Sequence, residues 1–312
     1  MLPVHAPFVW ALQNHSPALS LAQWCALGTQ ALTGPPPPLA MAQAAGRAPA
    51  SALAAVRAGS RVPSVRASLA VRLLEHSTDA ADFTARWNLL NDAIASHHAT
   101  RLEWDGTSAL RLRHAYRTSG SLAPSHWLVA GAVAAGLSRL GIRVVLGGLE
   151  FAHGTIKGHP LQVQIHGQAE DDVVMELVGA ASCARPMQPP ALDLPASAPA
   201  VLQPVLQALL QEPGERWTLE RAAAHAGMSP RSLQRVLASE CVTWPQVVRA
   251  LRVQAAGDLV LARNTSLTRI AHAVGFSDSA HLSRCFHTAA GLSPSAYRAM
   301  AHGRSRWRGV MG

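Results

Sequence analysis

The spacing of apolar residues changes along the first 184 residues, which predicts a mixture of helices and strands. Between residues 100 and 116, apolar and polar residues alternate on both sides of Asp105-Gly106, which is the pattern of a β-hairpin. We therefore expect an α+β fold for this half of the chain. Helices are expected within residues 1–32 and at about 64–76, 79–97 and 124–140, and further strands at 142–151, 161–166 and 173–178.

The second half of the chain is expected to be all-α. Residues 185–200 contain five prolines and no regular period, which predicts a semi-rigid linker between domains. Helical spacing resumes at Val201, and one long joining helix is expected at 243–261. The expected organisation is an effector-binding or dimerisation domain at 1–184, a linker at 185–200, a helical domain at 201–300 and a basic tail at 301–312.

Two similar blocks lie within this helical domain. In the first, residues 219–240, a small residue at Ala223 lets two helices cross closely and Gly227 suits the tight turn between them. Leu233 then holds the second helix against the first, and Ser229 is a favourable N-cap for that second helix. This block predicts a helix-turn-helix unit.

The second block repeats the pattern near residues 270–287. Gly275 turns the chain, and Asp278 or Ser277 caps the next helix. Its apolar anchor, Leu282, lies seven residues after the glycine, against six in the first block, so we expect a turn one residue longer. Either block alone is also what an ordinary pair of core helices would show. Two blocks in phase within one basic segment favour two helix-turn-helix units.

The outward face of the second helix in each block carries side chains suited to DNA. Arginine and glutamine donate paired hydrogen bonds to guanine and adenine edges in the major groove. The first block offers both residue types, whereas the second offers no glutamine or asparagine and should read fewer bases, with Arg284 as its main contact. The candidate DNA-binding residues are Ser229, Arg231, Ser232, Gln234, Arg235, Ser279, Ala280, His281, Ser283, Arg284 and His287.

The distribution of charge agrees with this division. The chain has a formal charge of +9, and Lys157 is its only lysine. Residues 201–312 carry 13 arginines against 6 acidic residues, a net charge of +7, and the other 200 residues carry a net charge of +2. A basic half beside a nearly neutral half suits a DNA-binding domain joined to a sensing or dimerising domain.

Other chemistry has weaker signals in the sequence. The four cysteines are far apart without C-x-x-C spacing, and fifteen histidines make chance neighbours common, so we expect no metal site and no cofactor. Phosphate-binding loops and hydrolase motifs are absent from the sequence. The start of the chain lacks a signal-peptide pattern, and arginines interrupt the longest apolar stretch, residues 128–149. These features favour a cytoplasmic protein that does not enter the membrane.

Residues 218–297 closely resemble the AraC/XylS-type DNA-binding domain. The matching motifs are "MSPRSLQRVLASE", Arg252 with Ala256, "IAHAVGFSDSAHLSRCFH" and "GLSPSAYR". The resemblance implies that two recognition helices enter successive major-groove segments of double-stranded DNA, about 34 Å apart. Cys241 stands where such sequences usually have glycine, so we expect a strained helix end there. Residues 288–290 replace a usually basic or aromatic run, which puts a phosphate contact from that helix end in question.

The order of elements in residues 79–153 also resembles the N-terminal ligand-sensing, arabinose-binding-like domain of the ornithine-utilisation-regulator subgroup. The matching parts are the helix at 79–97, the hairpin at 100–116, the helix at 124–140 and "VVLGGLEFAH" at 144–153. This resemblance implies a small-molecule effector and a homodimer, and we also expect RNA polymerase as a partner. It assigns no effector-binding residues.

An enzyme carrying an AraC-type domain, such as a DNA-repair alkyltransferase, is the alternative from another class. Such an enzyme needs a metal-held or activated cysteine. None of the four cysteines has suitable neighbours in the sequence. The expected function is therefore that of a sequence-specific transcription regulator and not of an enzyme.

Overall fold

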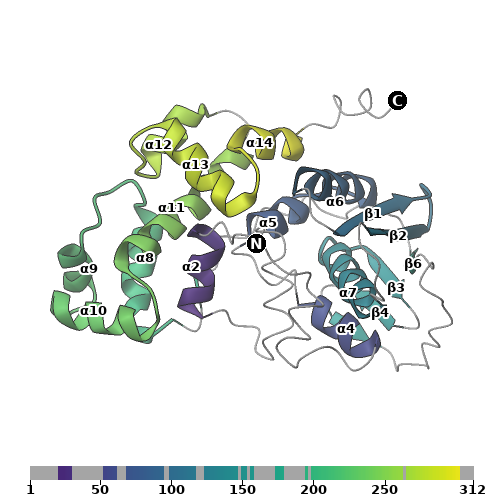
Figure 1. Cartoon of the computed structure of the whole chain (residues 1–312), viewed down its shortest axis with the longest axis horizontal. Coiled ribbons are helices and arrows are strands. Elements are labelled where there is room, and N and C mark those ends of the chain that lie inside the picture. Colours follow the sequence, from purple (N-terminus) through teal and green to yellow (C-terminus); the bar gives the residue numbers. More distant parts are fainter. Residues whose placement is uncertain are drawn as a thin grey trace.

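The structure, a computed structural model, contains an α+β part followed by an all-helical part (Figure 1). This order agrees with the fold class expected from the sequence. The residues that the structure describes are 20–29, 52–61, 68–94, 98–116, 123–146, 149–152, 155–157, 173–178, 194–195, 198–262 and 265–302.

The strands of the described residues form one six-stranded antiparallel sheet with the order β1-β2-β6-β3-β4-β5. The expected hairpin is present, and the Asp105 carboxylate accepts hydrogen bonds from the backbone N–H groups of Thr107 and Ser108 in its turn. The strands are β1 (His98–Trp104), β2 (Ala109–Tyr116), β3 (Arg143–Leu146), β4 (Leu149–Ala152), β5 (Thr155–Lys157) and β6 (Val173–Val178).

Two features of this sheet differ from the sequence-based expectation. Residues 142–151 were expected to form a single strand, but they form the hairpin β3–β4, in which Leu146 pairs with Leu149. The sequence carries Gly147-Gly148 between them, a two-residue turn signal that the apolar run hid. The three-residue strand β5 was not expected. The strand expected at 161–166 lies outside the described residues.

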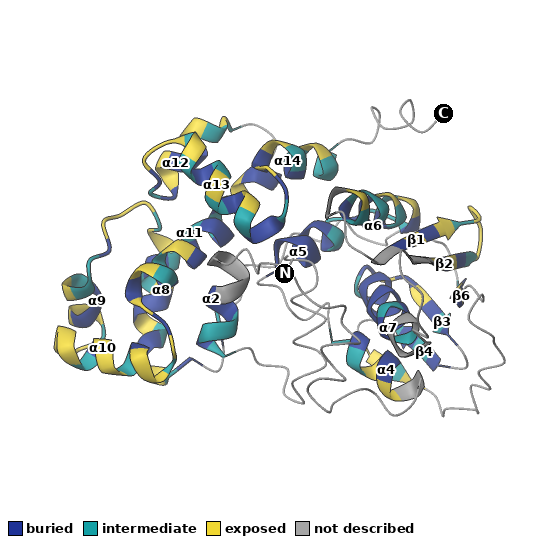
Figure 2. Cartoon of the chain, viewed as in Figure 1, coloured by how far each residue is buried: buried dark blue, intermediate teal, exposed yellow. Residues whose placement is uncertain are grey.

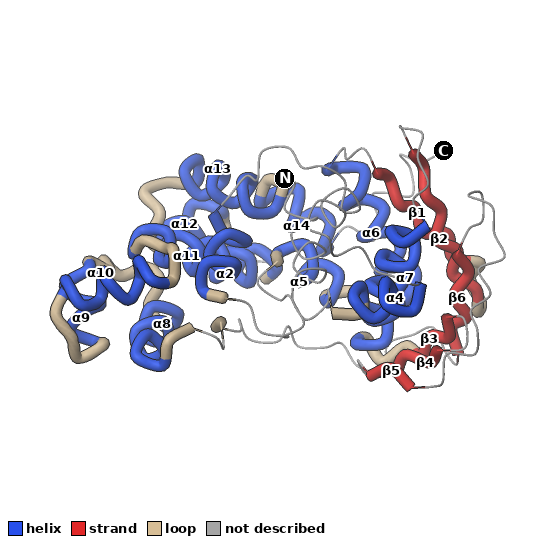
Figure 3. Tube along the Cα trace, turned by 60° about the horizontal axis from the view of Figure 1, so that its bottom comes forward, coloured by secondary structure: helices blue, strands red, loops and turns tan. Residues whose placement is uncertain are grey.

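Helices α4, α6 and α7 lie on one side of the sheet (Figure 3). The opposite side carries charged residues, including the exposed Arg101, Glu103, Arg111 and Arg113, which explains the alternation along β1 and β2. The helices expected at 64–76 and 79–97 are present over residues 69–75 and 80–94, and the helix expected at 124–140 spans 123–139. The described residues of this half form helices α2 (Leu21–Thr29), α4 (Ala52–Gly59), α5 (Leu69–Glu75), α6 (Ala80–Ile94) and α7 (Ala123–Arg139).

The helical part is built around the long joining helix α11. This helix begins one residue later than expected and ends at the expected Leu261. No helix in the described ranges is long and apolar enough to cross a lipid bilayer. The elements are the 3-10 helix η2 (Ala200–Leu202) and the α-helices α8 (Gln203–Gln211), α9 (Leu219–His225), α10 (Pro230–Ser239), α11 (Trp244–Leu261), α12 (Leu267–Ala273), α13 (Ser279–Ala290) and α14 (Pro294–His302).

The clusters of buried residues do not divide at the Pro-rich segment. Figure 2 shows buried residues, in dark blue, in both parts of the chain. One cluster of buried residues runs from the sheet and α7 to α8, α9, α10 and the first half of α11. A second cluster joins Leu69 and Leu73 of α5 to Ile270, Phe286 and Tyr297 of the last three helices. Helix α2 also packs against α11 and α13, at the left of Figure 1. The domain boundaries at 184 and 200 therefore stay predictions.

Candidate nucleic-acid interface

The first helix pair, α9 and α10, is formed by local signals that the sequence shows. Helix α9 ends in a turn in which Gly227 has φ +64°, and the N–H of Met228 donates to the carbonyl of Ala223 at 3.0 Å. This is the hydrogen-bond pattern of a glycine-terminated helix. Ser229 caps α10 by accepting from the N–H of Ser232 at 3.1 Å. Leu233, the expected anchor, is fully buried.

The second helix pair, α12 and α13, follows the same plan with the expected longer turn. Five residues, 274–278, separate its helices, against four, 226–229, in the first pair. Gly275 has φ +83°, and Asp278 is the N-cap, accepting from the N–H of His281 at 2.7 Å. That hydrogen bond lowers the pKa of the Asp278 carboxyl below its usual value.

The exposure of the candidate residues follows the expected faces of α10 and α13. On α10, Ala238 is exposed beside the candidates. Within the described residues, the arginines among the candidates form no ion pair, so their guanidinium groups remain free for another partner. Ser229, Arg231, Gln234, Arg235, Ala280, Arg284 and His287 are exposed, whereas Ser232, Ser279, His281 and Ser283 are half-buried.

Some of these residues also have contacts that shape the helices. The ring of His281 meets the ring of Phe276 edge-on, with centroids 5.1 Å apart, so His281 helps to hold the start of α13. At the other end of α13, Ala289 and Ala290 are buried. Their burial agrees with the doubt raised by the sequence about a phosphate contact from this helix end.

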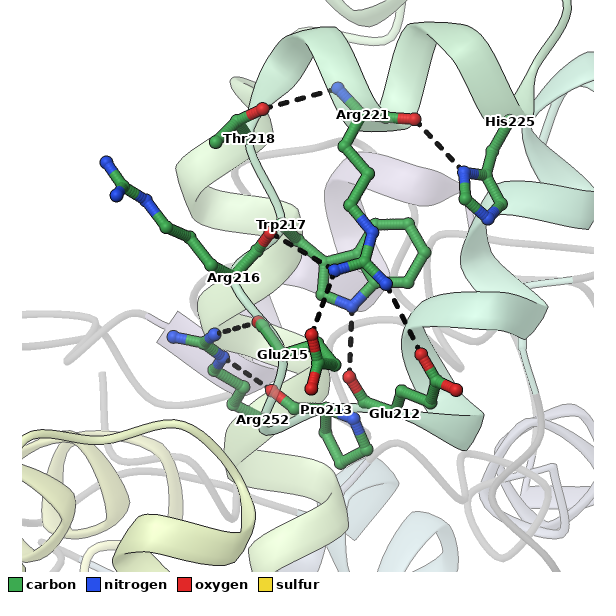
Figure 4. Close-up of polar contacts among 9 residues, drawn as sticks. All are labelled: Glu212, Pro213, Glu215, Arg216, Trp217, Thr218, Arg221, His225 and Arg252. Atoms are coloured by element: carbon green, nitrogen blue, oxygen red, sulfur yellow. Dashed lines mark hydrogen bonds and ion pairs between the residues drawn. The ribbon is translucent and has the colours of Figure 1, made fainter.

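Arg252 of α11 links the segment before the first helix pair, drawn in Figure 4, to the turn of the second pair. Its guanidinium donates to the carbonyl oxygens of Pro213 at 2.9 Å and Glu215 at 2.8 Å, just before the first pair. It also donates to the carbonyl of Gly275 at 2.8 Å, in the turn of the second pair. The positive φ of Gly275 favours glycine, and a side chain there would place its Cβ 2.5 Å from Cζ of Arg252, so the guanidinium would have to shift. The sequence motif contained Arg252 but did not reveal this role.

Arg221 of α9 is held in place, unlike the free arginines of α10. Its guanidinium lies 4.4 Å from the ring centroid of Trp217. It also pairs with the carboxylates of Glu215 at 3.1 Å and Glu212 at 3.3 Å (Figure 4). Cation–π stacking and two acidic neighbours offset its charge. Arg221 therefore stabilises the approach to α9, and the free positive charge lies on the next helix.

Two of the described cysteines, Cys25 and Cys285, lack the properties of an alkyl-accepting nucleophile. Burial raises the pKa of the Cys25 thiol to about 12 and raises that of Cys285, and a raised pKa disfavours the reactive thiolate. The described part of the chain contains no group of three or more histidine, cysteine or acidic side chains that could hold a metal ion. Cys183 lies outside the described residues.

Known proteins resemble the helical part of the chain. Residues 222–300 match the family model described as a helix-turn-helix domain. The ornithine utilization regulator of Pseudomonas aeruginosa is 37% identical over 98 residues, which cover 31% of this chain and 29% of that protein. The transcriptional activator NphR of Rhodococcus sp is 35% identical over 81 residues, covering 26% of this chain and 24% of that protein.

Among solved structures, the DNA-binding domain of AdpA in complex with a target DNA is 29% identical, with a TM-score of 0.31. The match covers 34% of this chain and 96% of that domain. The chain spans less than a third of the length of the two curated relatives described above.

The C-terminal part of the chain is thus a helix-turn-helix domain. Its capped helices, glycine turns and buried anchors are what that class requires. More specifically, it is a domain of the AraC type, as the motifs of residues 218–297 implied, and its relatives are named as transcriptional regulators and activators. These relatives are not enzymes.

Proposed function

We propose that this protein is a sequence-specific DNA-binding transcription regulator in which both helix pairs act as helix-turn-helix units. In this proposal α10 and α13 are the recognition helices, and each enters one of two successive major-groove segments. The single observation that carries the proposal is the exposed row of Arg231, Gln234 and Arg235 on α10, whose arginines have no ion pair among the described residues. A helix that presents such donors can read base edges directly.

The two recognition helices have different roles in this proposal. Helix α10 offers two arginines and one glutamine, whereas α13 offers Arg284 with His287 and small residues. Helix α10 therefore supplies most of the base discrimination, and α13 adds one specific contact together with phosphate binding. The remaining candidates at the starts of the two helices, including Ser229 and Ser279, lie where backbone N–H groups bind phosphates.

The proposal also includes three partners that rest on sequence resemblance alone. A small-molecule effector binds the N-terminal half, RNA polymerase is contacted at promoters, and two chains form a homodimer. The nearly neutral charge of the N-terminal half supports a role other than DNA binding for that half. Isothermal titration with candidate metabolites tests the effector, and sedimentation tests the dimer.

The experiment that tests base reading begins with a duplex that the full chain selects from random DNA. Binding of Arg235→Ala is then measured on this duplex and on a panel with single base-pair changes. We expect a loss of about 1–3 kcal/mol on the selected duplex and relaxed discrimination at one position. Arg284→Ala should reduce base discrimination at one position in the DNA segment contacted by α13.

Arg216→Ala is the matched control, because Arg216 is exposed and its loss removes the same charge outside the recognition helices. It should weaken binding to all duplexes equally, if at all. An equal loss on every duplex for Arg235→Ala would make Arg235 a phosphate contact and refute its assignment as a base contact. Failure of the full chain to select any sequence would refute the proposed function itself.

A further inference from the structure

A buried polar contact between the two halves of the chain lies on the joining helix α11. Nη1 of Arg72, in α5, donates to both the backbone carbonyl and the side-chain Oε1 of Gln254, each at 3.0 Å. The guanidinium of Arg72 also forms an ion pair with Asp258. Arg72 is 4% exposed and Gln254 is fully buried, although they lie 182 residues apart in the sequence.

The face of α11 that meets Arg72 is shaped for a close approach. Gly257 and Asp258 lie three and four residues after Gln254, so both are neighbours of Gln254 on the same side of the helix. A Cβ at residue 257 would lie 2.5 Å from a methyl group of Leu69, so a larger residue there would force the Leu69 side chain to shift. Glycine inside a long helix is otherwise unfavourable. The contact between α5 and α11 accounts for it.

Arg252 and Arg72 hold opposite sides of the same helix. An α-helix has about 3.6 residues per turn, so each residue is rotated by about 100° from the one before it. Gln254, two residues after Arg252, therefore lies about 200° around α11 from it. Arg252 ties one side of α11 to the backbone beside each helix pair. Arg72 ties the other side to the N-terminal half of the chain.

Two further hydrogen bonds extend this contact to the last helix. The hydroxyl of Tyr297, in α14, donates to the carbonyl of Leu69 at 2.8 Å. Nη2 of Arg86, in α6, donates to the carbonyl of Ala301 at 2.9 Å. The N-terminal half therefore contacts the joining helix and the helix that closes the second helix pair, and Figure 1 shows α5 lying between these helices and the sheet.

We propose that Arg72 is a positioning residue for DNA binding: it fixes α11 and so sets the spacing and angle between the two recognition helices. This inference rests on the proposed function. Helix α11 is the covalent connection between the two helix pairs, so a bend or rotation of α11 changes the distance from α10 to α13. A buried charged contact with defined hydrogen bonds specifies one geometry where apolar packing alone would tolerate several. Helix α5 is then one route, beside the packing of α2 on α11 and α13, by which the N-terminal half acts on DNA binding.

The test uses the full chain, a duplex it selects from random DNA, and a second duplex with one base pair inserted between the two recognised segments. The insertion rotates one segment by about 34° relative to the other, so a rigid pair of recognition helices cannot contact both. The wild-type chain should bind the inserted duplex at least about tenfold more weakly than the selected one. For Arg72→Ala, affinity for the selected duplex should fall and the penalty for the insertion should shrink several-fold.

Three further variants separate positioning from stability. Asp258→Asn keeps the shape of a half-exposed side chain and should reduce the insertion penalty even if Arg72→Ala does not fold. Arg72→Lys should restore part of the penalty, because it keeps the charge but not the planar fork. Leu110→Ala destabilises the sheet core far from α11 and should leave the insertion penalty at the wild-type value.

An unchanged insertion penalty in Asp258→Asn and in any folded Arg72 variant would overturn the positioning role while leaving the proposed function intact. A reduced penalty in Leu110→Ala as well would also overturn it, because loss of stability alone would then explain the effect. If the wild-type chain selects no sequence, the proposed function fails and the inference fails with it.

Discussion

Cys241 should destabilise the end of α10, and replacing it with glycine should stabilise the protein. Cys241 has φ +57° and is the one non-glycine residue in the described ranges with a positive φ. It occupies the same place as Gly227 after α9 and Gly275 after α12. Its N–H donates to the carbonyl of Ala238 at 3.0 Å, so the turn is fully formed in spite of the side chain. The strain expected from the sequence at this helix end is confirmed.

The size of the effect follows from two opposing terms. A side chain in the left-handed region costs about 1–2 kcal/mol relative to glycine. Glycine, in turn, gives the unfolded chain more freedom, which costs about 0.4–1 kcal/mol. The Cys241→Gly variant should therefore be more stable by about 1 kcal/mol. Cys241 is exposed, so the substitution leaves no cavity and adds no further cost.

Urea unfolding followed by tryptophan fluorescence measures this difference. Trp244 lies three residues beyond the substitution and donates its indole N–H to the carbonyl of Trp217, so both rings report on this region. The midpoint should rise at constant slope, by about 0.3 M if the slope is near 3 kcal/mol/M. Cys241→Ala is the matched control, because it keeps the strained Cβ and should show no gain. Equal stability of the glycine and alanine variants would refute the assignment of the strain to the backbone.

Two other predictions follow from single side chains. Arg252→Lys should lower the free energy of unfolding by about 2–3 kcal/mol, because one ammonium group cannot reach three carbonyls. The control, Arg249→Lys on the same helix, should change the free energy of unfolding by less than about 0.5 kcal/mol. Equal effects of the two substitutions in urea unfolding would contradict the joint role of Arg252. Burial raises the pKa of Cys25 from 9.0 to about 12, so the folded state favours the neutral thiol. The contribution of Cys25 to the free energy of unfolding should be fully present below pH 9 and should fall as the pH rises towards 12. Cys25→Ala should reduce this fall in unfolding experiments at graded pH, and an equally steep fall in the variant would contradict this cause.

The sequence predicted those parts of the fold that depend on local signals. Ser229, Gly227 and Gly275 determine where helices begin and end through their own backbone and neighbouring residues, so the first helix pair was located within one residue and the second within three. The short strand β5 and the break between β3 and β4 were missed because an apolar run of this length does not show where one strand stops.

The contacts of buried arginines could not be predicted from the sequence. A charged residue in a short apolar helix, such as Arg72, is equally compatible with an exposed position, and its partners lie 182 residues away. Arg252 was part of a motif, yet its three partners are backbone carbonyls. Every residue type has such a carbonyl, so the sequence does not indicate which residues Arg252 contacts. Exposed candidates such as Arg235 were placed on the correct face, because helical spacing alone determines which side of α10 is buried.

The two clusters of buried residues, each built from both halves of the chain, limit how this protein can be recombined with its relatives. A hybrid that joins residues 201–312 to a foreign N-terminal half would lose Leu69 and Leu73, and the apolar faces of α13 and α14 that pack against α5 would meet water. Such hybrids should be less soluble than the natural chain, because these apolar faces would be exposed. Modular exchange should therefore treat α5 as part of the DNA-binding module and move it together with α11.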